Sequence, residues 1–179
     1  MTMLDLPVPP ILKLGEGIAL LPGRAGDAVL EAVQAVMAAA PPRHLTTPWG
    51  KTMSVAMTNC GPLGWVADRE GYRYSPTDPL SGLPWPAMPA PLRDLAAESA
   101  LAAGFPGFAP EGCLVNRYGP EARMGLHQDR DERDLGQPIV SVSLGMSARF
   151  RIGGPKPPIR RGRSRSIMAT CWCSAGRRG

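Results

Sequence analysis

The sequence lacks a long apolar segment. No apolar run reaches the roughly 18 residues of a membrane span, and residues 1–21 are interrupted by Asp5, Lys13 and several prolines, so neither a span nor a signal peptide is expected. The four cysteines form no CxxC pair and no zinc-binding spacing, which indicates ordinary free thiols. We therefore expect a cytoplasmic, monomeric protein with no membrane segment, in which most of the 179 residues form one domain.

Acidic residues are absent from one end of the chain. The formal net charge is +5, but residues 155–179 contain seven basic side chains and no acidic one. Residues 1–154 are left with 13 basic and 15 acidic side chains, so the overall charge does not indicate a nucleic-acid surface on the body of the protein. Residues 155–179 show neither helical nor strand periodicity, and we expect a disordered basic tail there rather than a DNA-binding patch.

Two segments have the pattern of helices. Residues 26–42 carry apolar residues at helical spacing, with Asp27 as a candidate cap and Pro41 and Pro42 as a stop. Residues 91–103 begin with a proline suited to a first turn and precede Gly104, which predicts a second helix.

Strand signals dominate the rest of the chain. Residues 46–90 are rich in glycine, proline, threonine and aromatic residues, which is typical of short strands and ordered loops. From Cys113 the runs CLVNRY, PIVSVSLG and ARFRIGG are strand-like, and residues 139–144 alternate between an apolar and a mixed face. We expect an α+β, mainly β fold, a sandwich or jelly roll supported by N-terminal helices.

The segment LHQDRDE places His127 two positions before Asp129. Side chains two residues apart on a strand share a face, so an imidazole and a carboxylate could bind one divalent cation. A distant second histidine would complete the two-histidine, one-carboxylate arrangement of Fe(II) sites. By itself the pair favours a simpler interpretation, a solvated turn with a hydrogen-bonded histidine, and its surroundings decide between the two.

Those surroundings resemble a known family. Residues 116–154, NRYGPEARMGLHQDRDERDLGQPIVSVSLGMSARFRIGG, resemble the core of the AlkB family of Fe(II)- and 2-oxoglutarate-dependent dioxygenases. Residues 47–89, TPWGKTMSVAMTNCGPLGWVADREGYRYSPTDPLSGLPWPAMP, resemble the nucleotide-recognition lid of its bacterial DNA-repair branch. The resemblance implies a double-stranded β-helix (jelly roll), incomplete within residues 1–154, with a lid over 46–90 and the first part of the core over 112–154. It also implies oxidative dealkylation of N-alkylated bases in DNA, using Fe(II), 2-oxoglutarate and O2.

The resemblance also implies individual roles. His127 and Asp129 match iron ligands, while Asn116 and Tyr118 match residues that hydrogen-bond 2-oxoglutarate, with Arg117 pointing elsewhere.

On the substrate side, Trp65 matches the aromatic residue that stacks on the damaged base. Asp131 matches the acidic residue that faces the exocyclic amine of adenine or cytosine. The remaining implied contacts with the nucleotide are made by Tyr72 and Tyr74 and by the apolar wall residues Met53 and Met57. The sequence alone leaves open that the lid residues are core residues and that Asp131 is a solvated charge.

A third iron ligand is absent from the matching segments. In the family, the second histidine and two arginines that bind 2-oxoglutarate follow the Gly-Gly pair, but the 52 residues after His127 contain no histidine. His44, the other histidine, lies outside the matching motifs. Reading SIMATCWCSAGRR with each codon taken from the last base of one codon and the first two of the next permits HGDVLV(F/L)GGP, similar to the family segment HGDVVVWGG. We infer a frame-shifted translation after about Gly154.

Two functions of different classes remain. The first is a DNA-repair dioxygenase for which the sequence after about Gly154 is an error. The second is a truncated, non-catalytic remnant with at most weak metal or nucleic-acid binding. Alkylated RNA is a further possible substrate, which the similarity of the lid to the DNA-repair branch disfavours. The sequence does not choose between single-stranded and double-stranded DNA.

Overall fold

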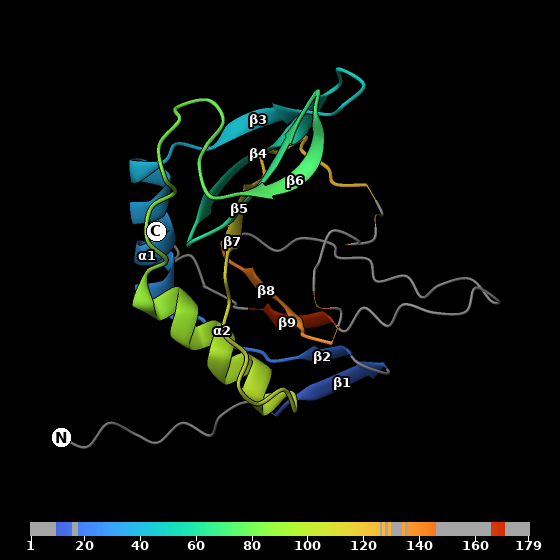
Figure 1. The fold of residues 1–179 in the computed structure, drawn as a ribbon. Helices are drawn as coiled ribbons and strands as arrows, with labels where there is room; N and C mark the ends of the chain where they lie inside the picture. Colours follow the sequence, from blue (N-terminus) through green and yellow to red (C-terminus); the bar gives the residue numbers. More distant parts are fainter. Residues whose placement is uncertain are drawn as a thin grey trace, which may run out of the picture.

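The fold is mainly β, with two helices on one side of the strands (Figure 1). The strands form three separate sheets, and no closed barrel occurs within the described residues. The computed structural model describes residues 10–15, 18–125, 127, 129, 134 and 136–145, together with the backbone of 166–170.

The elements follow one another along the chain. In order they are β1 (Leu12–Gly15), β2 (Ile18–Leu20), α1 (Asp27–Ala39), β3 (Arg43–Thr46), β4 (Thr52–Cys60), β5 (Gly64–Asp68), β6 (Gly71–Ser75), α2 (Ala90–Ala102), β7 (Cys113–Arg117), β8 (Ile139–Ser143) and β9 (Ser166–Thr170).

Both predicted helices are confirmed. The cap of α1 is Gly26, with no side-chain hydrogen bond, so the prediction that Asp27 caps the helix is wrong. Asp27 lies instead in the first turn, where its carboxylate faces the positive end of the helix dipole. Helix α2 carries a proline in its first turn and ends before Gly104, which has a φ of +93°. Neither helix has the length and apolar character to cross a bilayer, within the part of the chain that the structure describes.

Strand β4 is the middle strand of the sheet that positions the site. It pairs antiparallel with β3 on one edge and with β7 on the other, and the β7 register joins Met57 to Asn116 and Thr58 to Val115. Strands β5 and β6 form a separate antiparallel hairpin. The third sheet has four strands in the order β1-β2-β9-β8.

The main apolar core lies between the helices and strands β4 and β7 (Figure 1). Partly buried Val142 and Leu144, which belong to the predicted apolar face of residues 139–144, pack against it. Helices and strands contribute these buried members: Ala25, Val29, Ala32, Val36, Cys60, Leu92, Leu95 and Val115. Because the helices cover this face of the β4–β7 pair, the opposite face is the one available to a site.

One segment of the tail that we expected to be disordered is a strand in the structure. Residues 166–170 form β9, which pairs parallel with β2 and with β8. The sequence shows no strand alternation there, so only long-range backbone pairing, which a local pattern does not encode, reveals the strand. The rest of residues 155–179 lies outside the described residues, as does the predicted strand ARFRIGG.

Two of the four cysteines face each other across the β4–β7 pair. Cys60 and Cys113 are register partners and are both free thiols, as predicted. A side-chain hydrogen bond with Cys113 and burial both raise the pKa of Cys60, so its thiol stays protonated at neutral pH. Cys171 and Cys173 lie outside the described residues.

Gly64 provides a stability test of the turn that leads into β5. A Cβ added there would overlap the indole ring of the buried Trp85 and approach the Cβ of Asn59 to 2.8 Å. We expect Gly64→Ala to lower the free energy of unfolding by about 1–3 kcal/mol, because an overpacked site must shift backbone or a rigid ring. Urea denaturation measures this change. Gly119→Ala is the matched control, since no atom lies within 4 Å of its added Cβ, and equal effects at both positions would contradict the packing argument.

Candidate metal and nucleotide site

One face of the β5–β6 hairpin carries the aromatic residues predicted for substrate contact. Trp65 and Tyr74 are register partners, and Tyr72 lies diagonal to Trp65. The rings of Trp65 and Tyr72 stack, with centroids 5.5 Å apart and planes inclined by 14°. Trp49, from the turn between β3 and β4, contacts Tyr72 edge to face at 6.3 Å and 64°. We call Trp65, Tyr72 and Trp49 the aromatic ladder.

The backbone of Trp65 is held by a side chain of the neighbouring strand. Asn59 is buried, its amide nitrogen donates to the Trp65 carbonyl at 3.0 Å, and its amide oxygen accepts from the Trp65 amide at 3.0 Å. This pair of bonds continues the strand pattern through a side chain, so the indole is fixed relative to β4. The absence of a side chain at Gly64 allows Trp85 to pack beside this link.

The two predicted wall methionines lie in the cluster that contains Trp65. Met57 is 4% exposed, whereas Met53 and Trp65 are partly buried against the same cluster. Ala122, from the loop after β7, packs there as well. Met57 is therefore a core residue of the cluster against which Trp65 packs. Through Ala122, the loop that leads to His127 packs against the same cluster.

The alternation of side chains along β7 sets the direction of Asn116, and Tyr118 follows just after the strand. Val115 faces the helices, so Asn116 faces the opposite side, next to Met57. The amide oxygen of Asn116 is buried without a hydrogen-bond partner. A half-turn of the amide would present its NH2 group there, and that donor suits an anionic cosubstrate. The Tyr118 hydroxyl donates to the Met124 sulfur at 3.8 Å, and burial raises the pKa of Tyr118, which keeps the phenol protonated as a donor.

His127 and Asp129 lie together beyond β7. His127 Nε2 and Asp129 Oδ1 are 3.3 Å apart, and the imidazole Nδ1 lies 2.8 Å from the Gly125 carbonyl. That carbonyl can only accept, so Nδ1 donates to it, and Nε2 is the ring nitrogen that faces the Asp129 carboxylate. Two donors that each lie about 2.1 Å from one ion are about 3 Å apart at a right angle. This donor pair therefore fits a divalent transition metal.

The loop before His127 is fastened to β4. Ser54 Oγ donates to the Arg123 carbonyl at 2.9 Å, and the Arg123 amide donates back to the same hydroxyl at 3.0 Å. These reciprocal bonds join positions 69 residues apart. The loop that leads to His127 is thus joined directly to β4, the strand that carries Met53 and Met57.

No third ligand joins the pair within the described residues. No group of three histidine, cysteine, aspartate or glutamate side chains suited to a metal occurs among them. His44 lies on β3, where its Nδ1 is 2.9 Å from the Met53 carbonyl. Asp131 lies outside the described residues.

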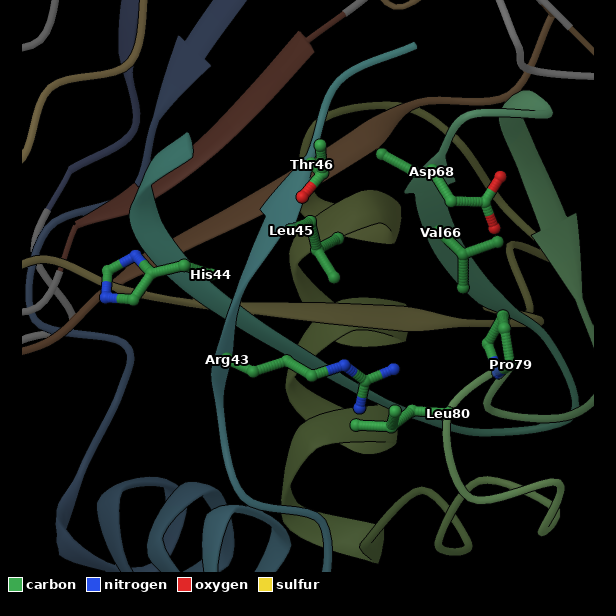
Figure 2. Close-up of a pocket in the computed structure, with 9 residues that line it drawn as sticks. Arg43, His44, Leu45, Thr46, Val66, Asp68, Pro79 and Leu80 are labelled. Carbon is green, nitrogen blue, oxygen red and sulfur yellow. The ribbon is translucent and has the colours of Figure 1, made fainter. Parts of the chain in front are cut away.

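An open pocket of about 430 Å³ lies between β3, β5 and the Pro79–Leu80 segment (Figure 2). Arg43 enters it and makes two hydrogen bonds with Asp78, one of them of 2.8 Å from Nη1 to Oδ2. His44 lines the rim but points to the other side of β3 from Arg43 (Figure 2). None of the predicted site residues lines this pocket.

The family comparison agrees with this arrangement. A model of the 2OG-Fe(II) oxygenase superfamily matches residues 20–168, and the chain belongs to that superfamily. The match continues past Gly154, the expected end of the resemblance.

The predicted resemblance to the AlkB family is confirmed by curated relatives. The chain is 53% identical over 132 residues to the alpha-ketoglutarate-dependent dioxygenase AlkB of Escherichia coli. The alignment covers 74% of this chain and 61% of that relative. It is 51% identical over 135 residues to the AlkB homolog of Caulobacter vibrioides, covering 75% and 60%. It is 36% identical over 110 residues to the DNA N(6)-methyladenine demethylase ALKBH1C of Arabidopsis thaliana, covering 51% and 24%. The chain thus spans about three fifths of the length of the bacterial relatives.

Three contributors to the site were not predicted from the sequence. Trp49 lies within the quoted lid motif, but its contact with Tyr72 depends on two hairpins meeting in space. Asn59 and Ser54 act through hydrogen bonds to the backbone of other segments. The only signal for Asn59 was a polar residue in the buried half of a strand, which usually has a specific partner.

The pair of Arg43 and Asp78 gives stability a dependence on pH. Burial opposes ionisation of Asp78, but hydrogen bonds from Arg43, the Leu80 amide and Ser81 outweigh it and lower the pKa of Asp78. A lowered pKa stabilises the fold fully above the unfolded value of about 3.9, and this contribution is lost as pH falls through the folded value. We expect Asp78→Asn to cost about 2 kcal/mol at pH 7 and progressively less below pH 4.

Urea denaturation between about pH 7 and about pH 3, a range that spans the unfolded carboxyl pKa of about 3.9, measures this difference. Asp94→Asn is the control, because its ion pair with Arg93 is exposed and should contribute little at any pH. A cost at Asp78 that is independent of pH would contradict the ion-pair explanation.

Proposed function

We propose that the protein acts in the oxidative dealkylation of N-alkylated bases in DNA, with Fe(II) as the metal and 2-oxoglutarate and O2 as cosubstrates. One observation carries the proposal. A superfamily defined by Fe(II) and 2-oxoglutarate matches the chain, and the loop leading to His127 and Asp129 packs through Ala122 against the cluster that holds Trp65. A metal pair and an aromatic wall are therefore neighbours, as chemistry on a stacked base requires.

Each side chain has a role in this proposal. His127 and Asp129 would hold the iron, and Asn116 and Tyr118 would hydrogen-bond 2-oxoglutarate. When bound, iron and cosubstrate would supply the oxidation of the N-alkyl carbon, and a hydroxylated methyl group would then leave as formaldehyde. The Gly125 carbonyl accepts from Nδ1 of this imidazole, which leaves Nε2 as the nitrogen that would bind the iron.

The lid would bind the base. In the proposal Trp65 stacks on the alkylated base, Tyr72, Tyr74 and Met57 shape its surroundings, and Asp131 faces the exocyclic amine. Two relatives from Arabidopsis thaliana are named as DNA N(6)-methyladenine demethylases, which supports DNA over RNA. We further propose a monomeric, cytoplasmic protein with jelly-roll topology.

The third ligand would come from the alternative reading frame after about Gly154. Residues 155–179 as printed contain no histidine, whereas the alternative frame permits the segment HGDV. The competing function, a non-catalytic remnant, applies if the printed frame is the one that is translated.

The first experiment tests the two metal ligands. We expect His127→Ala to weaken anaerobic Fe(II) binding at least tenfold, because a two-donor site becomes a single carboxylate. Isothermal titration measures the affinity. His44→Ala, which changes the only other histidine, should leave it unchanged, and the reverse pattern would show that the ligand assignment is wrong.

A second arm tests turnover. With oxygen and N-methylated single-stranded DNA, the protein with the present sequence should release little succinate. A protein translated in the alternative frame after codon 154 should release succinate and formaldehyde together. Equal inactivity of both proteins would favour the remnant. Preference for a methylated RNA of the same sequence would replace the DNA assignment.

A further inference from the structure

Trp49 is an exposed tryptophan on a rigid turn. The residue is 81% exposed, more than any other large apolar residue in the described part of the chain. Pro48 precedes it in a turn closed by a bond from the Gly50 amide to the Thr47 carbonyl at 2.9 Å. Proline is suited to this position of a turn because its φ is already fixed.

Further bonds hold the base of this turn. The Thr47 amide donates to the Lys51 carbonyl at 2.8 Å, and the Lys51 amide donates to Thr47 Oγ1 at 3.0 Å. Gly50 has a φ of +84°, which a residue with a side chain rarely adopts. The indole is therefore presented to water by a backbone that has little freedom to withdraw it.

Trp49 extends the stacked pair of the lid. Tyr72 stacks on Trp65 and also makes an edge-to-face contact with Trp49. The three rings therefore run from the partly buried Trp65 to the exposed turn. A single exposed apolar residue needs no explanation. A ladder that begins at the proposed base-stacking residue and ends on an open indole is continuous with the proposed binding surface.

We propose that Trp49 stacks on the nucleobase adjacent to the alkylated base in a single-stranded segment of DNA. This inference rests on the proposed function. Bases have π-faces that stack on aromatic side chains irrespective of sequence. The exposed Lys51 on the same turn adds a positive charge suited to the intervening phosphate. Trp49 thereby sets a requirement for a neighbouring base, which a free nucleotide does not meet.

The test is a cycle of protein and DNA changes. A short, labelled single-stranded oligonucleotide with one N-methylated adenine is compared with two others that carry an abasic site immediately 5′ or immediately 3′ of it. Fluorescence anisotropy gives the dissociation constant for each protein. We expect Trp49→Ala to weaken binding of the intact oligonucleotide about tenfold, and Trp49→Phe less than about threefold. On one of the two abasic oligonucleotides the loss should fall below about twofold, because the partner of the indole is already gone.

The matched control is Leu83→Ala, which removes another large apolar side chain, 65% exposed, and should leave binding unchanged. A Trp49→Ala effect under about twofold on the intact oligonucleotide, or an equal effect on all three, would overturn the inference. So would a concentration-dependent dimer of the wild type that Trp49→Ala dissolves, because a second copy would then occupy the indole.

Trp65→Ala separates this inference from the proposed function. Binding that depends on Trp65 and not on Trp49 overturns the inference alone. Binding that ignores both Trp65 and the methyl group contradicts the proposed function, and an absence of binding by the wild type contradicts both.

Discussion

The pairing of β4 with β7 sets the positions of most other residues discussed above. Its register places Thr58 opposite Val115 on the side of the helices and Met57 opposite Asn116 on the other side. A slip of one residue would exchange these faces, exposing the core and burying the polar amide. The helical core and the candidate site are therefore two consequences of one backbone register, and neither can change without the other.

The β5–β6 hairpin and the segment of His127 and Asp129 are attached to this same sheet by polar links. Asn59 joins β4 to the backbone of Trp65, and Ser54 joins β4 to the loop before His127. Each link uses a side chain to join β4 to a segment that is not paired with it in a sheet. They explain how short hairpins and loops can be positioned accurately for chemistry without a continuous sheet.

Local pattern predicted much of the fold. The helices were predictable because apolar spacing, proline and glycine act within a few residues, and residues 139–144 because alternation is local. Strand β9 was not, since its two parallel pairings bring together residues far apart in the chain. In the site, the spacing of His127 and Asp129 predicted a shared face on a strand, whereas both residues lie after β7 and outside any strand. The resemblance supplied Trp65, Asn116 and the roles expected of them. Trp49 and Asn59 required the third dimension, because their partners lie on other elements.

The positions of the tryptophans give residues 46–90 a distinctive intrinsic fluorescence. Of the four tryptophans, Trp49, Trp65 and Trp85 lie within residues 46–90, while Trp172 lies outside the described residues. Trp49 is 81% exposed and Trp85 is 7% exposed. An excited indole emits at longer wavelength when water dipoles can reorient around it, so among the three described tryptophans we expect Trp49 to emit at the longest wavelength and Trp85 at the shortest. The tryptophan fluorescence of residues 46–90 therefore reports how far water reaches these side chains, without any attached dye.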